Sequence, residues 1–144
     1  MDTSEKGIIF GGPMIRAILW RDKTQTRRLM RPQPVVTEEG RFVWKGVDWG
    51  AVGDALALAA PYGLPGETLY VKETVRVQNV GKRGQPPLFA VRRVATDSVT
   101  FLTPAQFGGN WKRYVEPGVH TIPARFIPRA LARLRIEVED IWVE

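Results

Sequence analysis

The chain has 144 residues, 44% of them hydrophobic and 25% charged, which is the composition of a folded domain with a core of its own. Its 21 Lys and Arg residues outnumber its 15 Asp and Glu residues, and the net charge of +6 favours polyanionic partners, nucleic acid first. Because there is no cysteine and His120 is the single histidine, disulfide scaffolds, thiolate metal sites, cysteine nucleophiles and multi-histidine zinc sites are excluded.

The sequence contains no recognisable targeting or membrane segment. The first residues lack the apolar stretch of a signal peptide, and no segment has the apolar length that spans a bilayer. We therefore expect a soluble intracellular protein that makes no membrane contact and holds no metal or other cofactor. We also expect one domain over residues 1–144, with disorder in the polar residues 1–6.

The N-terminal part of the chain predicts a strand followed by a helix. Residues 8–10 are apolar and predict a buried strand, which Gly11 and Gly12 end. Pro13 suits the first turn of a helix, where its missing N–H is not needed. The next apolar residues recur at helical spacing and predict one apolar face, made of Ile15, Ile18 and Leu19.

The middle of the chain is irregular until one clear strand. We expect a short strand at residues 42–44 and buried extended chain at residues 55–60. Pro65 and Gly66 fit the central positions of a type II turn, in which glycine supplies the positive φ. Apolar residues then alternate with polar ones over residues 68–77, which predicts one strand.

The second half of the chain predicts further strands and single helical turns. A strand at residues 88–94 follows a loop at residues 79–87, and residues 97–109 are typical of a loop with one helical turn. A helical turn at residues 128–132 and a strand at residues 134–138 come last. Several short strands with one strong helix predict an α+β fold, in which a small β-barrel has helical turns at its rim.

A dense group of hydrogen-bond donors follows the predicted helix. Three cations and two hydroxyls lie within six residues, namely Lys23, Thr24, Thr26, Arg27 and Arg28. So many donors need an acceptor-rich partner. The alternative is a solvated helix end, because the helix dipole favours cations near a helix C-terminus.

Four blocks of residues, in this order along the chain, carry a resemblance to a known family. They are Gly12-Pro13-Met14-x-Arg16-Ala17-Ile18, then Lys23-Thr24-Gln25-Thr26-Arg27-Arg28 with Arg31-Pro32-Gln33-Pro34, then Pro61-Tyr62-Gly63-x-Pro65-Gly66-x-x-Leu69-Tyr70-Val71-Lys72-Glu73-Thr74, and Ile127-Pro128-Arg129-x-x-x-Arg133-x-x-Ile136-Glu137-Val138. With these blocks the chain resembles the phage and prophage branch of the ASCH domains, which have a PUA-like fold. The resemblance implies a single domain with a PUA-like β-barrel, located in the cytoplasm of a bacterial host. It also implies a cleft between barrel and helix, lined by Lys23, Thr24, Thr26 and Arg28.

Glu73 falls on the apolar face of the strand predicted at residues 68–77. A buried carboxylate is costly unless a cation or hydrogen bonds satisfy it. The best candidates for that cation lie in residues 23–28, and Arg129 and Arg133 come next. The pair is either a structural ion pair or a part of the cleft that the resemblance implies, with Glu73 facing the donors.

A cleft with these groups would bind RNA or a nucleotide. A carboxylate accepts from an exocyclic amine, and cations meet phosphate or carbonyl oxygens. Trp111 either stacks on an unpaired base or packs in the core. Arg129 and Arg133 share one face if their segment is helical, and there they either follow phosphates or remain solvated.

Two alternative functions remain open from the sequence. Some ASCH proteins are amidohydrolases that deacylate N4-acetylcytidine with a lysine, a threonine and a glutamate. Lys23 and Thr26 match the first two by motif, and Glu73 substitutes for the third by geometry alone. The second alternative is a phage structural or assembly-associated protein without a ligand, in which the same residues only stabilise the fold.

Overall fold

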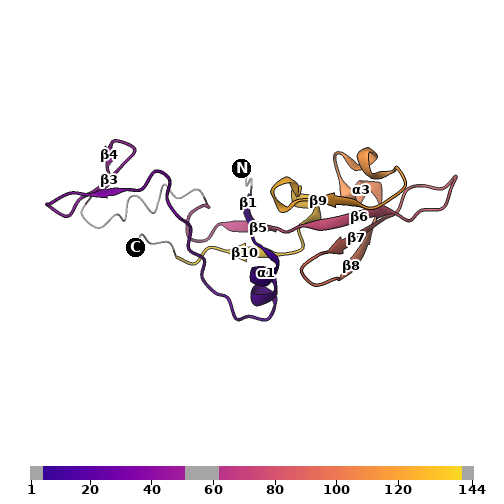
Figure 1. Ribbon diagram of the computed structural model, residues 1–144, viewed down its shortest axis with the longest axis horizontal. Helices are drawn as coiled ribbons and strands as arrows, with labels where there is room; N and C mark the ends of the chain where they lie inside the picture. The colour runs from indigo at the N-terminus through magenta and orange to yellow at the C-terminus, as the bar shows by residue number, and fades with distance from the viewer. Residues whose placement is uncertain (1–4, 51–61, 141–144) are drawn as a thin grey trace. The chain divides into compact units, whose positions relative to one another are not determined.

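The computed structural model describes residues 5–50 and 62–140, which form a mixed α+β structure of short strands with few helices (Figure 1). The elements in chain order are β1 (Lys6–Ile9), α1 (Gly12–Leu19), β2 (Val35–Val36), β3 (Phe42–Trp44), β4 (Val47–Asp48), β5 (Thr68–Lys72), β6 (Val75–Asn79), β7 (Phe89–Arg93), β8 (Val99–Leu102), α3 (Pro104–Phe107), η1 (Trp111–Tyr114), β9 (His120–Ile122), η2 (Ala124–Phe126), η3 (Arg129–Leu131) and β10 (Arg135–Glu137). The strands form sheets of order β1-β5-β10, β2-β3-β4 and β8-β7-β6-β9, and none closes into a barrel within the described residues. The predicted α+β fold with one main helix after the first strand is confirmed, whereas the closed barrel is not.

Two compact units make up the described chain. The first contains residues 5–6, 25–50, 62–69 and 136–140, and the second contains residues 7–24 and 70–135. Each unit is assembled from segments that are far apart in the sequence. For this reason no change of composition marks a boundary, and the sequence alone predicts a single domain.

The first unit contains the β-meander β2-β3-β4. Its antiparallel register places Trp44 opposite Val47, so the short strand predicted here is confirmed. The indole N–H of Trp44 donates to the Pro32 carbonyl at 2.6 Å and ties the loop before β2 to the meander. Gly66 has a φ of +90°, as the predicted type II turn requires. The extended chain predicted at residues 55–60 lies outside the described residues.

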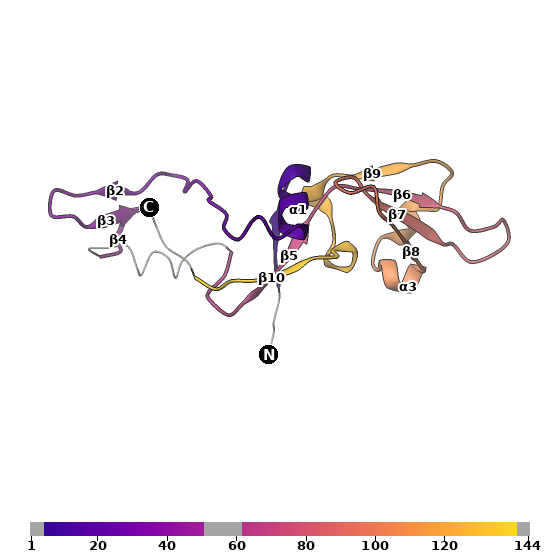
Figure 2. The same ribbon diagram turned by 90° about the horizontal axis from the view of Figure 1, so that it is seen from below.

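The main sheet of the second unit is β8-β7-β6-β9, and Figure 2 shows α3 beside β8. The hairpin of β6 and β7 is closed by the loop predicted at residues 79–87. One face of the sheet is buried against α3 and the segments that follow it, and the core consists of Val75, Val77, Phe89, Val91, Phe107, Ile122, Ile127 and Leu131. The helical turn predicted in residues 97–109 is α3, which begins with a capping box between Thr103 and Gln106.

The single strand predicted at residues 68–77 is in fact two strands. β5 ends at Lys72 and β6 begins at Val75, and Glu73 and Thr74 join them. The two strands belong to different sheets. The alternation of apolar and polar residues continues across the join, so the sequence pattern contains no sign of the change of sheet.

Two further elements differ from the predictions. Residues 99–102 are predicted as loop and form β8, an edge strand in which only Leu102 is half-buried. A strand shows alternating apolar and polar residues because one of its faces is buried. Since β8 is almost entirely exposed, its sequence shows little of this alternation. β1 begins at Lys6, inside the stretch 1–6 that is expected to be disordered.

Candidate functional site

Helix α1 ends before the donor-rich residues, in a Schellman motif. The backbone N–H of Arg21 donates to the Ile18 carbonyl at 3.1 Å, and that of Asp22 donates to the Ala17 carbonyl at 2.9 Å. Arg21 has a φ of +63°, the left-handed conformation that this motif requires. The chain has left the helix before Lys23. The effect of the helix dipole is confined to the last turn, so it does not account for the donors from Thr24 onward. That these exposed side chains are simply solvated stays the alternative.

Residues 23–28, here called the donor segment, contain no helix or strand. Lys23 is half-buried, and its backbone N–H donates to the Ala17 carbonyl at 3.2 Å. Its ammonium group lies 5.8 Å from the centroid of the Phe10 ring, within the range of a cation–π contact. Thr24 is exposed. Both residues belong to the second unit.

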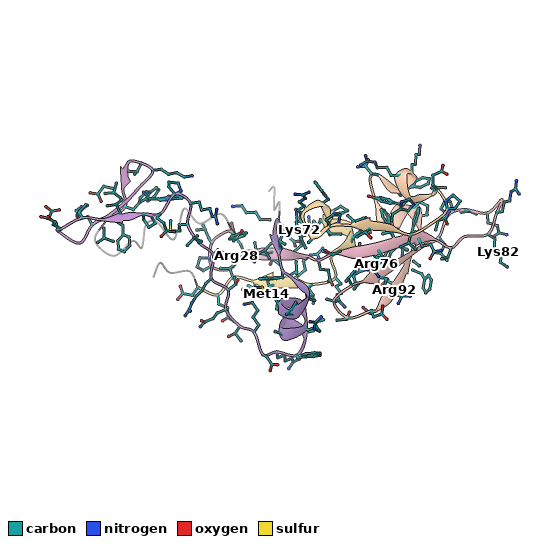
Figure 3. All side chains as sticks on the ribbon, viewed as in Figure 1. Met14, Arg28, Lys72, Arg76, Lys82 and Arg92 are labelled. Carbon is teal, nitrogen blue, oxygen red and sulfur yellow. The ribbon has the colours of Figure 1, made fainter. Side chains whose placement is uncertain are left out.

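The other polar candidates of the donor segment, Thr26, Arg27 and Arg28, belong to the first unit and are exposed. The guanidinium of Arg28, labelled in Figure 3, lies 5.7 Å from the centroid of the Tyr62 ring. The donor segment thus carries exposed hydroxyls and guanidinium groups on a stretch without regular structure. The cleft predicted between this segment and Glu73 stays a prediction.

Glu73 is buried and paired with a cation, as its place on the apolar face predicts. It is 2% exposed, and Arg133 Nε and Nη2 donate to its two carboxylate oxygens at 2.8 and 2.9 Å. Arg133 Nη1 donates to Ser98 Oγ at 3.1 Å. The cation that satisfies Glu73 is therefore Arg133 and not a residue of the donor segment, because the turn after η3 brings Arg133 to the join between β5 and β6.

Another arginine, which is buried where Arg133 is half-buried, lies beside this ion pair and has no role in the sequence predictions. Arg93 is 4% exposed, and its Nη1 and Nη2 donate to the carbonyls of Val91 and Leu131 at 3.3 and 3.1 Å. Its Nε has no hydrogen-bond partner among the described residues. Burial lowers the pKa of the Arg93 guanidinium, and the nearby carboxylate of Glu73 opposes that shift. The signal for this residue is its alternation with Phe89 and Val91 on the buried face of β7.

Trp111 and Arg129, the remaining candidates, also belong to the second unit. The ring centroid of Trp111 lies 6.3 Å from that of Phe89, so this half-buried side chain packs against the core, which is one of its two predicted roles. Arg129 is exposed on η3. Since η3 ends at Leu131, Arg133 lies outside the helical turn. The condition under which Arg129 and Arg133 would share one helical face is therefore not met.

Positively charged side chains outnumber carboxylates among the candidate residues. In the buried cluster one carboxylate, Glu73, stands against the guanidinium groups of Arg93 and Arg133. Over residues 5–50 and 62–140 no three His, Asp or Glu side chains lie where they could hold a metal ion together. The helices in these residues are all too short or too polar to cross a membrane.

Neither a protein-family model, nor a curated protein, nor a solved structure matches the chain. A functional assignment therefore depends on the residues and their geometry.

Proposed function

We propose that the chain is an ASCH-type protein of phage or prophage origin, with a PUA-like fold, that binds RNA or a nucleotide through its donor segment. One observation carries the proposal. The donor segment begins after the Schellman motif of α1, so Thr24, Thr26, Arg27 and Arg28 are exposed outside regular structure. Hydroxyl and guanidinium donors suit phosphate oxygens and base edges. The net charge of +6 supports the same kind of partner.

Arg129 and Arg133 add further cations to this proposal. Glu73 and Ser98 hold the guanidinium of Arg133 at three nitrogens, so its positive charge is fixed in position. Glu73 acts through Arg133, because both of its carboxylate oxygens accept from that guanidinium. Trp111 has the weakest support as a stacking residue, because its ring packs against the core.

The amidohydrolase alternative has less support. It requires a carboxylate that exchanges a proton with Lys23 or Thr26. Both carboxylate oxygens of Glu73 are already engaged by Arg133, and this leaves Glu73 poorly suited to that task. A structural protein without a ligand is the remaining alternative, and it predicts that Lys23→Ala changes stability alone.

A titration of fluorescently labelled single-stranded RNA at two salt concentrations tests the proposal. Lys23→Ala and Arg28→Ala should each weaken binding and reduce the slope of log K against log salt by about 0.7, the value for one phosphate contact on a single strand. Arg41→Ala is the matched control, because it removes another exposed arginine of the first unit, one that pairs with Asp48. We expect this control to bind as the wild type does.

Three results would contradict the proposal. They are the absence of RNA binding at low salt, equal binding by the two donor-segment variants and the wild type, and metal-free deacylation of N4-acetylcytidine that Lys23→Ala abolishes. The last result would identify an amidohydrolase instead.

A further inference from the structure

The sheet β8-β7-β6-β9 has a second face, opposite to the core, that carries cations and an aromatic ring. Side chains alternate along each strand, so the residues between the buried ones point to this face. We call it the outer face, and it consists of Arg76, Gln78, Ala90, Arg92, Val99, Phe101 and Thr121. All of them are exposed except Ala90, which is half-buried.

The strand register arranges these residues in two rows across the sheet. In the first row Arg76 lies directly between Thr121 and Arg92, and Val99 follows on β8. Figure 3 labels Arg76 and Arg92 on the two neighbouring strands. In a directly opposite pair the Cβ atoms are roughly 5 Å apart. The two guanidinium groups therefore belong to one small area of the surface.

Two like charges in directly opposite positions destabilise a sheet. Arg92 has a partner, since its Nη1 donates to Asp97 at 2.7 Å. For Arg76 the described part of the chain supplies neither an ion pair nor a side-chain hydrogen bond. The positive charge of Arg76 is thus available to an anion from outside the chain.

The second row of the outer face places an aromatic ring beside this charge. Gln78, Ala90 and Phe101 lie next to one another across β6, β7 and β8. Phe101 is 59% exposed, and the small side chain of Ala90 leaves room beside its ring. Gln78 adds an amide, which can donate and accept hydrogen bonds.

We propose that the outer face binds single-stranded nucleic acid. Arg76 and Arg92 meet phosphate oxygens, a base stacks on Phe101, and the amide of Gln78 reads a base edge. Lys82 and Arg83 are exposed on the loop between β6 and β7 and add positive charge at that end of the hairpin. Figure 3 labels Lys82 on this loop. RNA and DNA single strands share this chemistry. The outer face shares no residue with the donor segment, so this proposal does not depend on that segment binding RNA.

Fluorescence anisotropy with the full chain tests the proposal. The probes are a labelled oligouridine, the oligothymidine of equal length and a duplex DNA, and comparison of the first two separates RNA from DNA. Phe101→Leu keeps an apolar side chain but removes the stacking ring, and it should weaken single-strand binding by roughly five- to 150-fold. Arg76→Gln should weaken binding and reduce the salt slope by about 0.7.

The chain offers a matched control for each variant. Phe126→Leu removes another exposed ring, 62% exposed and outside this sheet. Arg113→Gln removes another exposed arginine of the second unit, on η1. Both controls should bind as the wild type does. None of the four variants should lower the melting temperature, because the substituted side chains are exposed and Arg76→Gln also removes a like charge opposite Arg92.

Loss of binding in the outer-face variants with unchanged binding in Arg28→Ala would support this proposal and contradict the donor segment as the site. The reverse result would overturn this proposal and leave the donor segment. Equal losses in variants and controls, or equally tight binding of duplex DNA, would also overturn it, since stacking on Phe101 requires an unpaired base.

Discussion

Two ion pairs of this protein have the same chemistry and opposite surroundings. In the first unit, Arg41 Nε lies 2.6 Å from a carboxylate oxygen of Asp48, and both side chains are about half exposed, at 50% and 47%. In the second unit, Arg133 Nε lies 2.8 Å from a carboxylate oxygen of Glu73, and the exposed fractions are 23% and 2%. The distances are alike. Burial, together with the second hydrogen bond that Arg133 Nη2 makes to Glu73, separates what the two pairs contribute.

The two pairs also differ in how far apart their partners lie in the sequence. Arg41 and Asp48 are seven residues apart and lie on the same meander, whereas Glu73 and Arg133 are 60 residues apart. The side chains of the exposed pair are hydrated in both the folded and the unfolded state, and water and salt screen their attraction. The buried pair joins distant segments and is strongly destabilising when broken, because one charge is then left in the core.

The largest effect is expected from Arg133→Met. This substitution leaves the buried Glu73 carboxylate without its hydrogen-bonded cation, with the charge of Arg93 as its remaining compensation. It should lower the free energy of unfolding by up to about 3–5 kcal/mol. Urea unfolding followed by circular dichroism measures the change. The control is Arg41→Met, which removes the same group from the exposed pair and should leave the unfolding curve unchanged within error. Equal losses in the two variants would show that burial does not separate the pairs.

The double variant Glu73→Leu with Arg133→Met should be more stable than the sum of the two single losses predicts. Removing both partners leaves no buried carboxylate without its hydrogen-bonded cation, and Arg93 keeps its two carbonyl acceptors. Coupling within such a pair is about 0.5–3 kcal/mol. A double-mutant cycle in urea measures the coupling free energy. Strictly additive losses would mean that the two side chains do not interact in solution.

A smaller effect is expected at Arg21, where the backbone and not the charge matters. Its φ of +63° is unfavourable for a residue with a Cβ atom and suits glycine. Arg21→Gly should raise the free energy of unfolding by up to about 1 kcal/mol. Arg27→Gly is the control, because Arg27 has no positive φ, so glycine there relieves no backbone strain and adds chain entropy to the unfolded state. If both substitutions destabilise equally, the Schellman motif is not formed.

The smallest effect concerns the titration of Asp48. The hydrogen bond from Arg41, and then the backbone N–H of Gly50, hold the pKa of the Asp48 carboxyl below its ordinary value. A lowered folded-state pKa adds stability above the unfolded-state pKa, and this stability is lost as the pH falls through the folded-state value. In Arg41→Ala the pKa of Asp48 should rise and yet stay lowered, since Gly50 still donates. NMR titration of the carboxyl measures it, and an unchanged pKa would mean that the exposed pair does not persist in solution.

Much of the local structure follows from the sequence. Pro13 and the apolar spacing around Ile15 predict α1, and the single helical turn predicted in residues 97–109 is α3. These predictions succeed because caps, turns and helix starts depend on residues only a few positions apart. The end of α1 is harder to predict, because its left-handed residue is Arg21 and not the glycine that usually signals this motif.

In the candidate site, too, the sequence predicts what depends on nearby residues and misses what depends on distant ones. The alternation of side chains placed Glu73 on a buried face and required a cation for it, and the donor segment is visible in the sequence as a run of polar residues. By itself, then, the sequence determined the α+β class, the helix, the turns and the need to neutralise Glu73. Only the tertiary structure decided that Arg133 supplies the charge and that the strand around Glu73 is divided between two sheets. It also decided that Arg76 and Phe101 share one face. These three features depend on which strands and turns, far apart in the chain, pair with one another. The sequence pattern does not contain this information, because a strand shows the same period-two alternation whichever strand it pairs with.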